Sequence, residues 1–269
     1  MKQEKSEDES IDQFYNWIRN YWCALSQDPV NGCSGLLNFG CWDNNPANLY
    51  EAQDRLFNIC IQELRPFQAE SKGLEVGCGI GGNSLRLCLN EPVTMTAIDI
   101  SEDQLTVATK LADEAGCGDK ITYMHGNSMA MPFNSGSFDF SICIESTFHY
   151  SSVARFIMEQ KRVLKPGKLA VIADITCEKY EKVKFRKGNF FCSMSYLTGL
   201  LKKSGLEILN VNRIGPYVFE PLYRYVSDYN TYNHSKVAKY WNLVLCNYAN
   251  LARRGLMGYD IFVVRKPMD

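Results

Sequence analysis

A glycine-rich run limits the folds that this chain can adopt. Its sequence is Leu74-Glu-Val-Gly77-Cys-Gly79-Ile-Gly81-Gly82, and it lies between a short apolar run and a segment of helical periodicity. Glycines let the chain turn sharply and let a ligand approach bare backbone, and a helix that begins there favours a negative group. The spacing of Gly77, Gly79 and Gly82 also satisfies GxGxxG, so a dinucleotide cofactor remains open at this point.

After residue 73 the chain alternates short apolar runs with helical patterns, which favours parallel strands joined by right-handed crossovers. We therefore predict an α/β fold: a Rossmann-like, seven-stranded mixed sheet with helices on both faces and an antiparallel last strand. The predicted strands are 73–77, 93–99, 121–125, 138–144, 168–174, 206–213 and 257–265, and the predicted helices are 82–89, 102–115, 153–164 and 195–204.

Composition divides the chain into three predicted segments. Residues 1–10 are highly charged and are expected to form a disordered tail. Residues 11–70 are expected to form a helical lid, because both ends have helical periodicity around a Gly/Asn/Pro-rich loop. Residues 71–269 are expected to form the core, with an aromatic-rich insertion at about 215–255 that caps a substrate pocket. We expect lid and cap to lie over the carboxyl edge of the sheet.

Charge and cysteine content exclude several classes of protein. Lys and Arg total 29 against 30 Asp and Glu, so there is no positive field to hold nucleic acid. The eleven cysteines include no CxxC pair, which argues against a disulfide framework and a structural zinc site; no metal is predicted. No run approaches the ~18 apolar residues of a membrane span. We therefore expect a cytoplasmic protein without stable membrane insertion, whose oligomeric state the sequence does not reveal.

Two carboxylates favour one cofactor over the others. Asp99 lies twenty residues beyond Gly79 at the end of the second predicted strand, where a carboxylate can accept hydrogen bonds from ribose hydroxyls. Glu75 precedes the first glycine by two positions and can meet an ammonium group, which a pyrophosphate-binding loop does not require. S-adenosylmethionine has an ammonium group and no pyrophosphate, so Glu75 favours it over a dinucleotide.

Five motifs in order strengthen this assignment. They are Glu75-Val-Gly77-Cys-Gly79-Ile-Gly81, Ala97-Ile-Asp99-Ile-Ser101, Gly126-Asn-Ser-Met-Ala-Met-Pro132-Phe, Ser137-Phe-Asp139 and Arg162-Val-Leu-Lys-Pro166-Gly. The series resembles that of class I S-adenosylmethionine-dependent methyltransferases over about residues 73–174. The small-molecule branch, with sugar O-methyltransferases and phosphoethanolamine methyltransferases, is the most similar.

The resemblance implies roles for individual residues. Gly77 and Gly79 would line the methionyl group, Asp99 would hold the ribose, and Ile100 would pack on the adenine. Asn127 and Ser128 would reach the adenine edge, although the family usually has Asp at position 127. An aromatic residue in Asn38-Phe-Gly40-Cys-Trp42, which resembles the family's N-x-G-x-W stretch, would shield the sulfonium. The implied cofactor site comprises Trp42, Glu75, Gly77, Gly79, Gly81, Asp99, Ile100, Gln104, Asn127, Ser128 and Glu145.

His149 and Asp174 are the predicted catalytic pair. His149 follows the fourth predicted strand and Asp174 ends the fifth, so both fall on the rim where this fold binds ligands. A histidine titrates near neutrality, and a nearby carboxylate would raise its basicity. The segment Glu145-Ser-Thr-Phe-His149 with a later Ala-Asp strand end resembles small-molecule methyltransferases in which these residues remove a proton from a hydroxyl group.

The sequence therefore predicts methyl transfer to a small molecule, most plausibly to oxygen. The first alternative is an N-methyltransferase of a small amine of the phosphoethanolamine or glycine type. A non-catalytic adenosylmethionine-binding protein is a more remote alternative, because it would not need both His149 and Asp174. A dinucleotide-dependent oxidoreductase is disfavoured because the sequence after the glycine loop has no nicotinamide pocket motif. A nucleic-acid methyltransferase is disfavoured by the charge balance.

Overall fold

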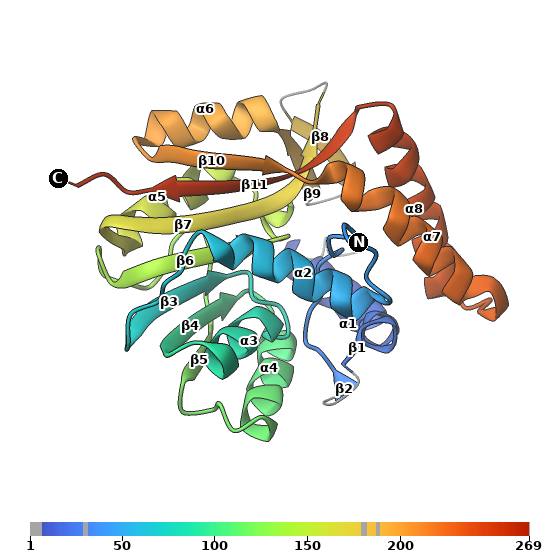
Figure 1. Ribbon diagram of the computed structural model, residues 1–269, viewed down its shortest axis with the longest axis horizontal. Helices are drawn as coiled ribbons and strands as arrows, with labels where there is room; N and C mark the ends of the chain where they lie inside the picture. Colours follow the sequence, from blue (N-terminus) through green and yellow to red (C-terminus); the bar gives the residue numbers. More distant parts are fainter. Residues whose placement is uncertain (1–6, 29–31, 179–181, 187–188, 269) are drawn as a thin grey trace, which may run out of the picture.

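The fold is a twisted sheet in which seven strands lie in the order β10-β11-β7-β6-β3-β4-β5 (Figure 1). It is seen in a computed structural model, which describes residues 7–28, 32–178, 182–186 and 189–268. The strands are β3 (Ser71–Val76), β4 (Val93–Asp99), β5 (Ile121–His125), β6 (Phe138–Ile144), β7 (Leu164–Cys177), β10 (Glu207–Arg213) and β11 (Met257–Arg265).

The predicted sheet is confirmed. Strands β3 to β7 pair in parallel, and β11 runs antiparallel to both β7 and β10, as expected for the last strand. Two further strands were not predicted: β8 (Lys182–Arg186) pairs with β9 (Asn189–Ser193), and β9 pairs with the end of β7. The sequence of β8, Lys-Val-Lys-Phe-Arg, does alternate charged and apolar residues, but the run is short and strongly basic, which favours a solvated segment over a strand.

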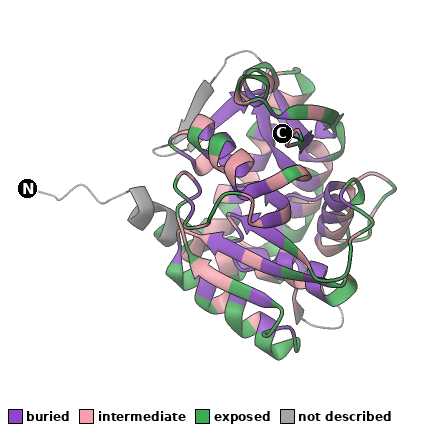
Figure 2. Ribbon diagram, turned by 90° about the vertical axis from the view of Figure 1, so that its left-hand side faces the viewer, coloured by how far each residue is buried: buried purple, intermediate pink, exposed green. Residues whose placement is uncertain are grey.

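Helices cover both faces of the sheet, because side chains alternate between two apolar layers along each central strand. In β6, Ile142 faces one layer, and Cys143 faces the other. Figure 2 shows the buried strands between helices whose outer faces are exposed. The helices are α1 (Glu7–Leu25), α2 (Leu49–Gln62), α3 (Gly82–Asn90), α4 (Glu102–Glu114), α5 (Val153–Val163), α6 (Met194–Ser204), α7 (Phe219–Tyr229) and α8 (Lys236–Arg253). Ser101 caps α4 by accepting a hydrogen bond from the Gln104 N–H, as its sequence position predicts.

The N-terminal segment is more ordered than its charge suggests. Helix α1 begins at Glu7, inside the stretch that was predicted to be a disordered tail, while residues 1–6 lie outside the described part of the chain. A short hairpin, β1 (Gln27–Asp28) and β2 (Gly32–Cys33), follows α1. The insertion after β10 is a pair of helices, α7 and α8, of which α8 contacts α1 (Figure 1).

Candidate active site

A cavity lies at the carboxyl ends of β3, β4 and β6, where parallel sheets of this kind leave room for a ligand. The loops that follow these three strands form its floor. Its roof comes from α1, from residues 35–39 and from α8. The segments predicted as lid and cap therefore both border the cavity that the glycine loop lines.

The glycine loop forms a bare backbone cradle. Gly77 has a φ of 73°, and a Cβ there would overlap the side chain of Ser146, so only glycine fits. Gly79, with a φ of 54°, also lines the cavity. Gly81 instead caps α3, and its carbonyl oxygen accepts a hydrogen bond from Tyr123 at 3.0 Å. Gly81 thus shapes the loop without lining the cavity.

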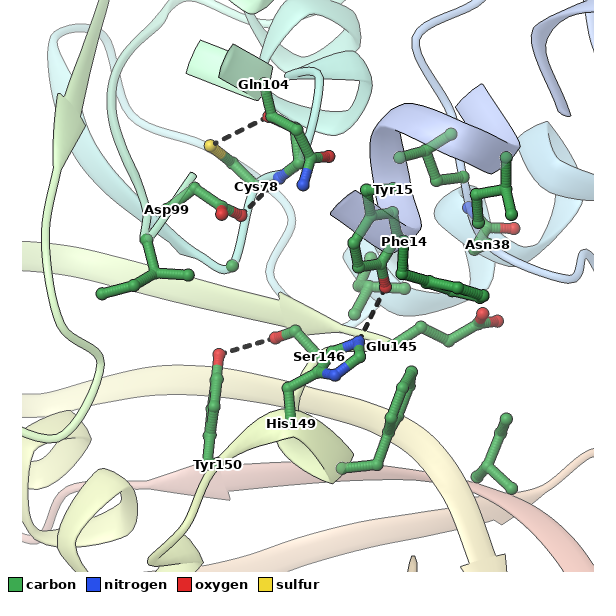
Figure 3. Close-up of a pocket in the computed structure, with 18 of the residues that line it drawn as sticks. Phe14, Tyr15, Asn38, Cys78, Asp99, Gln104, Glu145, Ser146, His149 and Tyr150 are labelled. Carbon is green, nitrogen blue, oxygen red and sulfur yellow. Dashed lines mark hydrogen bonds between the residues drawn. The ribbon is translucent and has the colours of Figure 1, made fainter. Parts of the chain in front are cut away.

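Asp99 borders the cavity beside this loop. One carboxylate oxygen accepts the Gly79 N–H at 2.8 Å, and the other accepts the Ser101 N–H at 3.0 Å (Figure 3). A carboxylate oxygen can accept more than one hydrogen bond, so a carboxylate at this place suits a diol as well as the backbone. The contact with Gly79 also fixes the glycine loop relative to β4.

Glu75 lies behind the glycine loop and does not line the cavity, so its contact with a ligand ammonium, directly or through water, stays a prediction. The carboxylate is 1% exposed and accepts hydrogen bonds from Asn83 at 2.9 Å and from the Ser84 N–H at 3.0 Å. Burial raises the pKa of Glu75 to about 7 against the opposing effect of these hydrogen bonds. Asn83 itself lines the cavity, so Glu75 acts on the site through Asn83 and the start of α3.

Four further residues of the predicted cofactor site border the same cavity. Ile100, Gln104, Asn127 and Ser128 all line the cavity. The Gln104 side chain is 3% exposed, and its Oε1 has no hydrogen-bond partner among the described residues. Oδ1 of the Asn127 side chain accepts the Met129 N–H at 2.8 Å. This hydrogen bond stabilises the local turn and uses part of the acceptor capacity that was assigned to the adenine.

Trp42 does not border the cavity, which corrects the prediction that it shields the cofactor. Its ring packs against Tyr225 of α7 at 5.1 Å, and its Nε1 donates to the Phe39 carbonyl at 3.1 Å. The aromatic residue of this segment that lines the cavity is Phe39. Of the Trp42 and Phe39 rings, only Phe39 lines the cavity, so an aromatic residue of this segment as a shield for the sulfonium stays a prediction.

His149 lies on the wall of the cavity opposite Asp99 (Figure 3). It ends a short 3₁₀ turn, Thr147–His149, that follows β6. Its Nε2 is 2.7 Å from the hydroxyl of Tyr15, which comes from α1. Tyr15 was not predicted, because nothing in the sequence relates two residues 134 positions apart.

Asp174 supports the turn that carries His149, and the predicted catalytic pairing of the two side chains stays a prediction. Its Oδ2 accepts the Thr147 N–H at 2.7 Å and the Thr147 hydroxyl at 2.5 Å, and its Oδ1 accepts the Ile175 N–H at 2.7 Å. The carboxyl is fully buried, and this burial raises the pKa of Asp174 to about 6. Asp174 is therefore a positioning residue for His149.

Glu145 is a carboxyl group inside the cavity. It has a φ of 52°, a left-handed conformation that is costly for a residue with a side chain. Its Oε1 accepts the Phe39 N–H of the roof at 2.8 Å. Burial raises the pKa of Glu145 to about 8, and the contact with Phe39 partly opposes this rise.

The remaining cavity wall is mostly apolar and aromatic. Trp22 of α1 packs against Trp241 of α8 with ring centroids 4.6 Å apart, which joins the two parts of the roof. Further apolar lining residues are Phe14, Ile18, Leu37, Phe148, Ile175, Phe191, Val244 and Tyr248. The sequence showed that the insertion was rich in aromatic residues but did not reveal which of them face the cavity.

Comparisons with known proteins agree with this geometry. Residues 74–172 match the methyltransferase domain family. The 27-O-demethylrifamycin SV methyltransferase of Amycolatopsis mediterranei is 32% identical over 138 residues, or 51% of this chain and 50% of that protein. The segment from residue 74 to residue 172, which carries the glycine loop, Asp99 and His149, is therefore similar to methyltransferases.

Two more comparisons cover most of the chain. The ajmaline N-methyltransferase of Rauvolfia serpentina is 28% identical over 227 residues, which cover 76% of this chain and 75% of the relative. The crystal structure of the [4+2]-cyclase SpnF superimposes with a TM-score of 0.81 over 97% of each chain, at 23% identity, which shows a shared fold.

The chain spans about half the length of the first curated relatives that it matches. Among the described residues, no helix has the length and apolarity needed to cross a bilayer. No three His, Cys, Asp or Glu side chains in the described ranges are arranged to hold a metal ion.

Proposed function

We propose that this protein transfers the methyl group of S-adenosylmethionine to a hydroxyl oxygen of a small, largely apolar molecule, with His149 as the general base. The observation that carries the proposal is the position of the His149 imidazole. It borders the same cavity as Gly77, Gly79 and Asp99, so a base and a cofactor cradle face one enclosed space.

The residues of the cavity fit this cofactor. Two buried polar atoms on its wall, Asn38 Nδ2 and Gln104 Oε1, have no hydrogen-bond partner among the described residues, as expected of groups that await a ligand. Asp99 would hold the ribose hydroxyls, and the bare backbone at Gly77 and Gly79 would admit the methionyl group. When bound, the cofactor supplies an electrophilic methyl group on a sulfonium.

The protein's own contribution is alignment, dehydration and proton removal. A neutral hydroxyl must lose its proton as it attacks, and an imidazole has a suitable pKa to accept it near neutral pH. Nε2 of His149 would take the proton once the acceptor hydroxyl has replaced the Tyr15 hydroxyl that is hydrogen-bonded to it, while Asp174 fixes the turn beneath the ring. The roof of α1 and α8 excludes water and holds the acceptor in line.

An apolar acceptor is supported by the composition of the wall. Side chains such as Trp22, Phe191 and Trp241 can bury a ring system but offer few charged partners to a small polar substrate. Two relatives are named 27-O-demethylrifamycin SV methyltransferase and ajmaline N-methyltransferase, which supports a small-molecule acceptor.

Glu145 favours a second candidate, an amine acceptor. A carboxylate on the cavity wall can bind an ammonium group, and cation binding would lower its raised pKa. In that case His149 would accept the ammonium proton, and the product would be an N-methyl compound.

A methyl-transfer screen tests the proposal. Purified protein is incubated with S-adenosylmethionine labelled in the methyl group and with phenols, polyketide alcohols, sugars, phosphoethanolamine and alkaloid amines. We expect label in an apolar alcohol or phenol, with an O-methyl product by mass spectrometry. Label in an amine alone would support the second candidate. Absence of transfer to every acceptor class, with intact cofactor binding, would contradict enzymatic methylation.

A further inference from the structure

Two cysteines at the edge of the cavity roof lie close enough to react with each other. Sγ of Cys23, near the end of α1, is 2.8 Å from Sγ of Cys33, which ends β2. A disulfide requires about 2.0 Å between the sulfurs, so a shift of less than about 1 Å would bring them to bonding distance. Both thiols are partly exposed, whereas eight of the other nine are buried, and Cys246 is partly exposed.

The surroundings make Cys33 the more reactive thiol. Its pKa is lowered because the Cys23 thiol and the Gly35 backbone N–H stabilise its thiolate, with a smaller contribution from the positive charge of Arg19. The pKa of Cys23 is raised, since its hydrogen bond with Cys33 and its partial burial both disfavour its thiolate. A partly exposed, acidic thiol beside a second thiol is the usual arrangement of a redox-sensitive pair.

We propose that Cys23 and Cys33 form a reversible disulfide that responds to small disulfides of the glutathione type. The Cys33 thiolate attacks one sulfur of the small disulfide and forms a mixed disulfide, and one thiolate leaves. Cys23 then loses its proton to water and attacks the Cys33 sulfur, and the second thiolate leaves. Two cysteine thiols are oxidised, and one small disulfide is reduced to two thiols.

The bond would join the two parts of the roof that border the cavity from the N-terminal side. Helix α1 contributes Tyr15 and Trp22, and the segment that begins two residues after Cys33 contributes Leu37 and Phe39. A cross-link between them would restrict any separation of α1 from this segment. Product release would then slow, an effect that rests on the proposed function, whereas formation of the disulfide does not.

The chemistry is tested on the full chain in glutathione buffers of graded redox potential. After alkylation and digestion, mass spectrometry should find one peptide pair linked through Cys23 and Cys33 in the oxidised protein. Cys23→Ser should retain a glutathione adduct on Cys33, and Cys33→Ser should abolish the linked pair. The control Cys246→Ser should oxidise like the unmodified chain. Failure to form the linked pair in folded protein, or equal alkylation rates for Cys33 and Cys246, would overturn the proposal.

The effect on the roof has a separate readout. The dissociation rate of S-adenosylhomocysteine is measured by stopped-flow fluorescence for the oxidised and reduced protein. We expect oxidation to slow dissociation at least several-fold, and reduction to restore the original rate. Equal rates with the disulfide in place would contradict the effect on release. Absence of binding in both states would contradict the proposed function and leave the disulfide itself standing.

Discussion

Asp99, Glu75, Asp174 and Glu145 differ in what their carboxylate oxygens already bind. Those of Glu75 and Asp174 are buried and bind the backbone and side chains of nearby turns, so these two acids shape the site from behind. Asp99 and Glu145 border the cavity. This difference decides which of the acids can meet a ligand directly.

The role of Asp99 is tested by removing its carboxylate. Asp99→Ala should weaken S-adenosylhomocysteine binding by about 1.5–3 kcal/mol, the range for hydrogen bonds to a charged group. Calorimetric titration measures the change, and Asp119→Ala, at an exposed position, should bind like the unmodified protein. Unchanged affinity in Asp99→Ala would exclude a ribose contact.

Glu145 makes stability depend on pH. Its pKa is raised to about 8 in the folded chain, above the ~4.3 of an unfolded glutamate, so the folded state binds the proton more tightly. The contribution of this proton to the free energy of unfolding is fully present below about pH 4 and is lost as the pH rises through 8.

Glu145→Gln should therefore melt at a higher temperature than the unmodified chain above pH 8, and the difference should shrink towards pH 4. Melting curves between pH 4 and pH 9 measure this, with the exposed Glu63→Gln as the matched control. A difference in melting temperature between Glu145→Gln and the unmodified chain that is the same at every pH would contradict the raised pKa.

At the scale of elements, the buried face of helix α1 holds this helix in place over the cavity. Trp22 is 1% exposed, packs against Trp241 and donates its Nε1 hydrogen to the Leu37 carbonyl at 3.0 Å. Trp17, on the same helix, is 44% exposed and packs against Tyr240 with ring centroids 5.2 Å apart. The helix therefore depends on its buried ring for its position over the cavity.

Trp22→Ala should lower the free energy of unfolding by about 3–5 kcal/mol, because it leaves a large cavity in the core. Trp17→Ala should cost about 1 kcal/mol, the scale of an exposed ring contact. Urea denaturation measures both. Similar losses for the two variants would show that α1 is not held by its buried face.

The elements themselves were largely predictable from the sequence. Four strand ranges, including β4 and β6, agree with the prediction to the residue, because short apolar runs alternate there with helical patterns. Strand β8 was missed although its residues alternate, because the run is only five residues long and its basic side chains favour a solvated segment. The start of α1 was placed at residue 11 rather than at Glu7, because charge alone was taken as evidence of disorder.

The site was only partly predictable, since its geometry depends on contacts between distant segments. The positions of Asp99, Gln104 and His149 on the cavity wall follow from their places after strands. The partner of each side chain could not be predicted from these places. Asp174 accepts a hydrogen bond from Thr147, and His149 is hydrogen-bonded to Tyr15 from another part of the chain.

At the scale of the whole molecule, one sheet edge brings the functional groups together. The loops after β3 and β4 supply the cofactor cradle, the turn after β6 supplies His149, and α1 and α8 close the space above them. The central claim is that His149 removes the proton of the acceptor in this shared cavity. That claim requires a base whose loss affects turnover but leaves the cofactor site intact.

The turnover of His149→Ala with the best acceptor from the screen tests this claim most directly. The account predicts a loss of about 10²–10⁴-fold, the range for a general base, with unchanged S-adenosylhomocysteine affinity. The exposed His234→Ala is the matched control and should retain full turnover. The rate of the unmodified enzyme should also rise with pH through the histidine pKa and lose that dependence in His149→Ala. Turnover and a pH profile that are unaltered in His149→Ala would contradict the account and leave alignment alone as the source of catalysis.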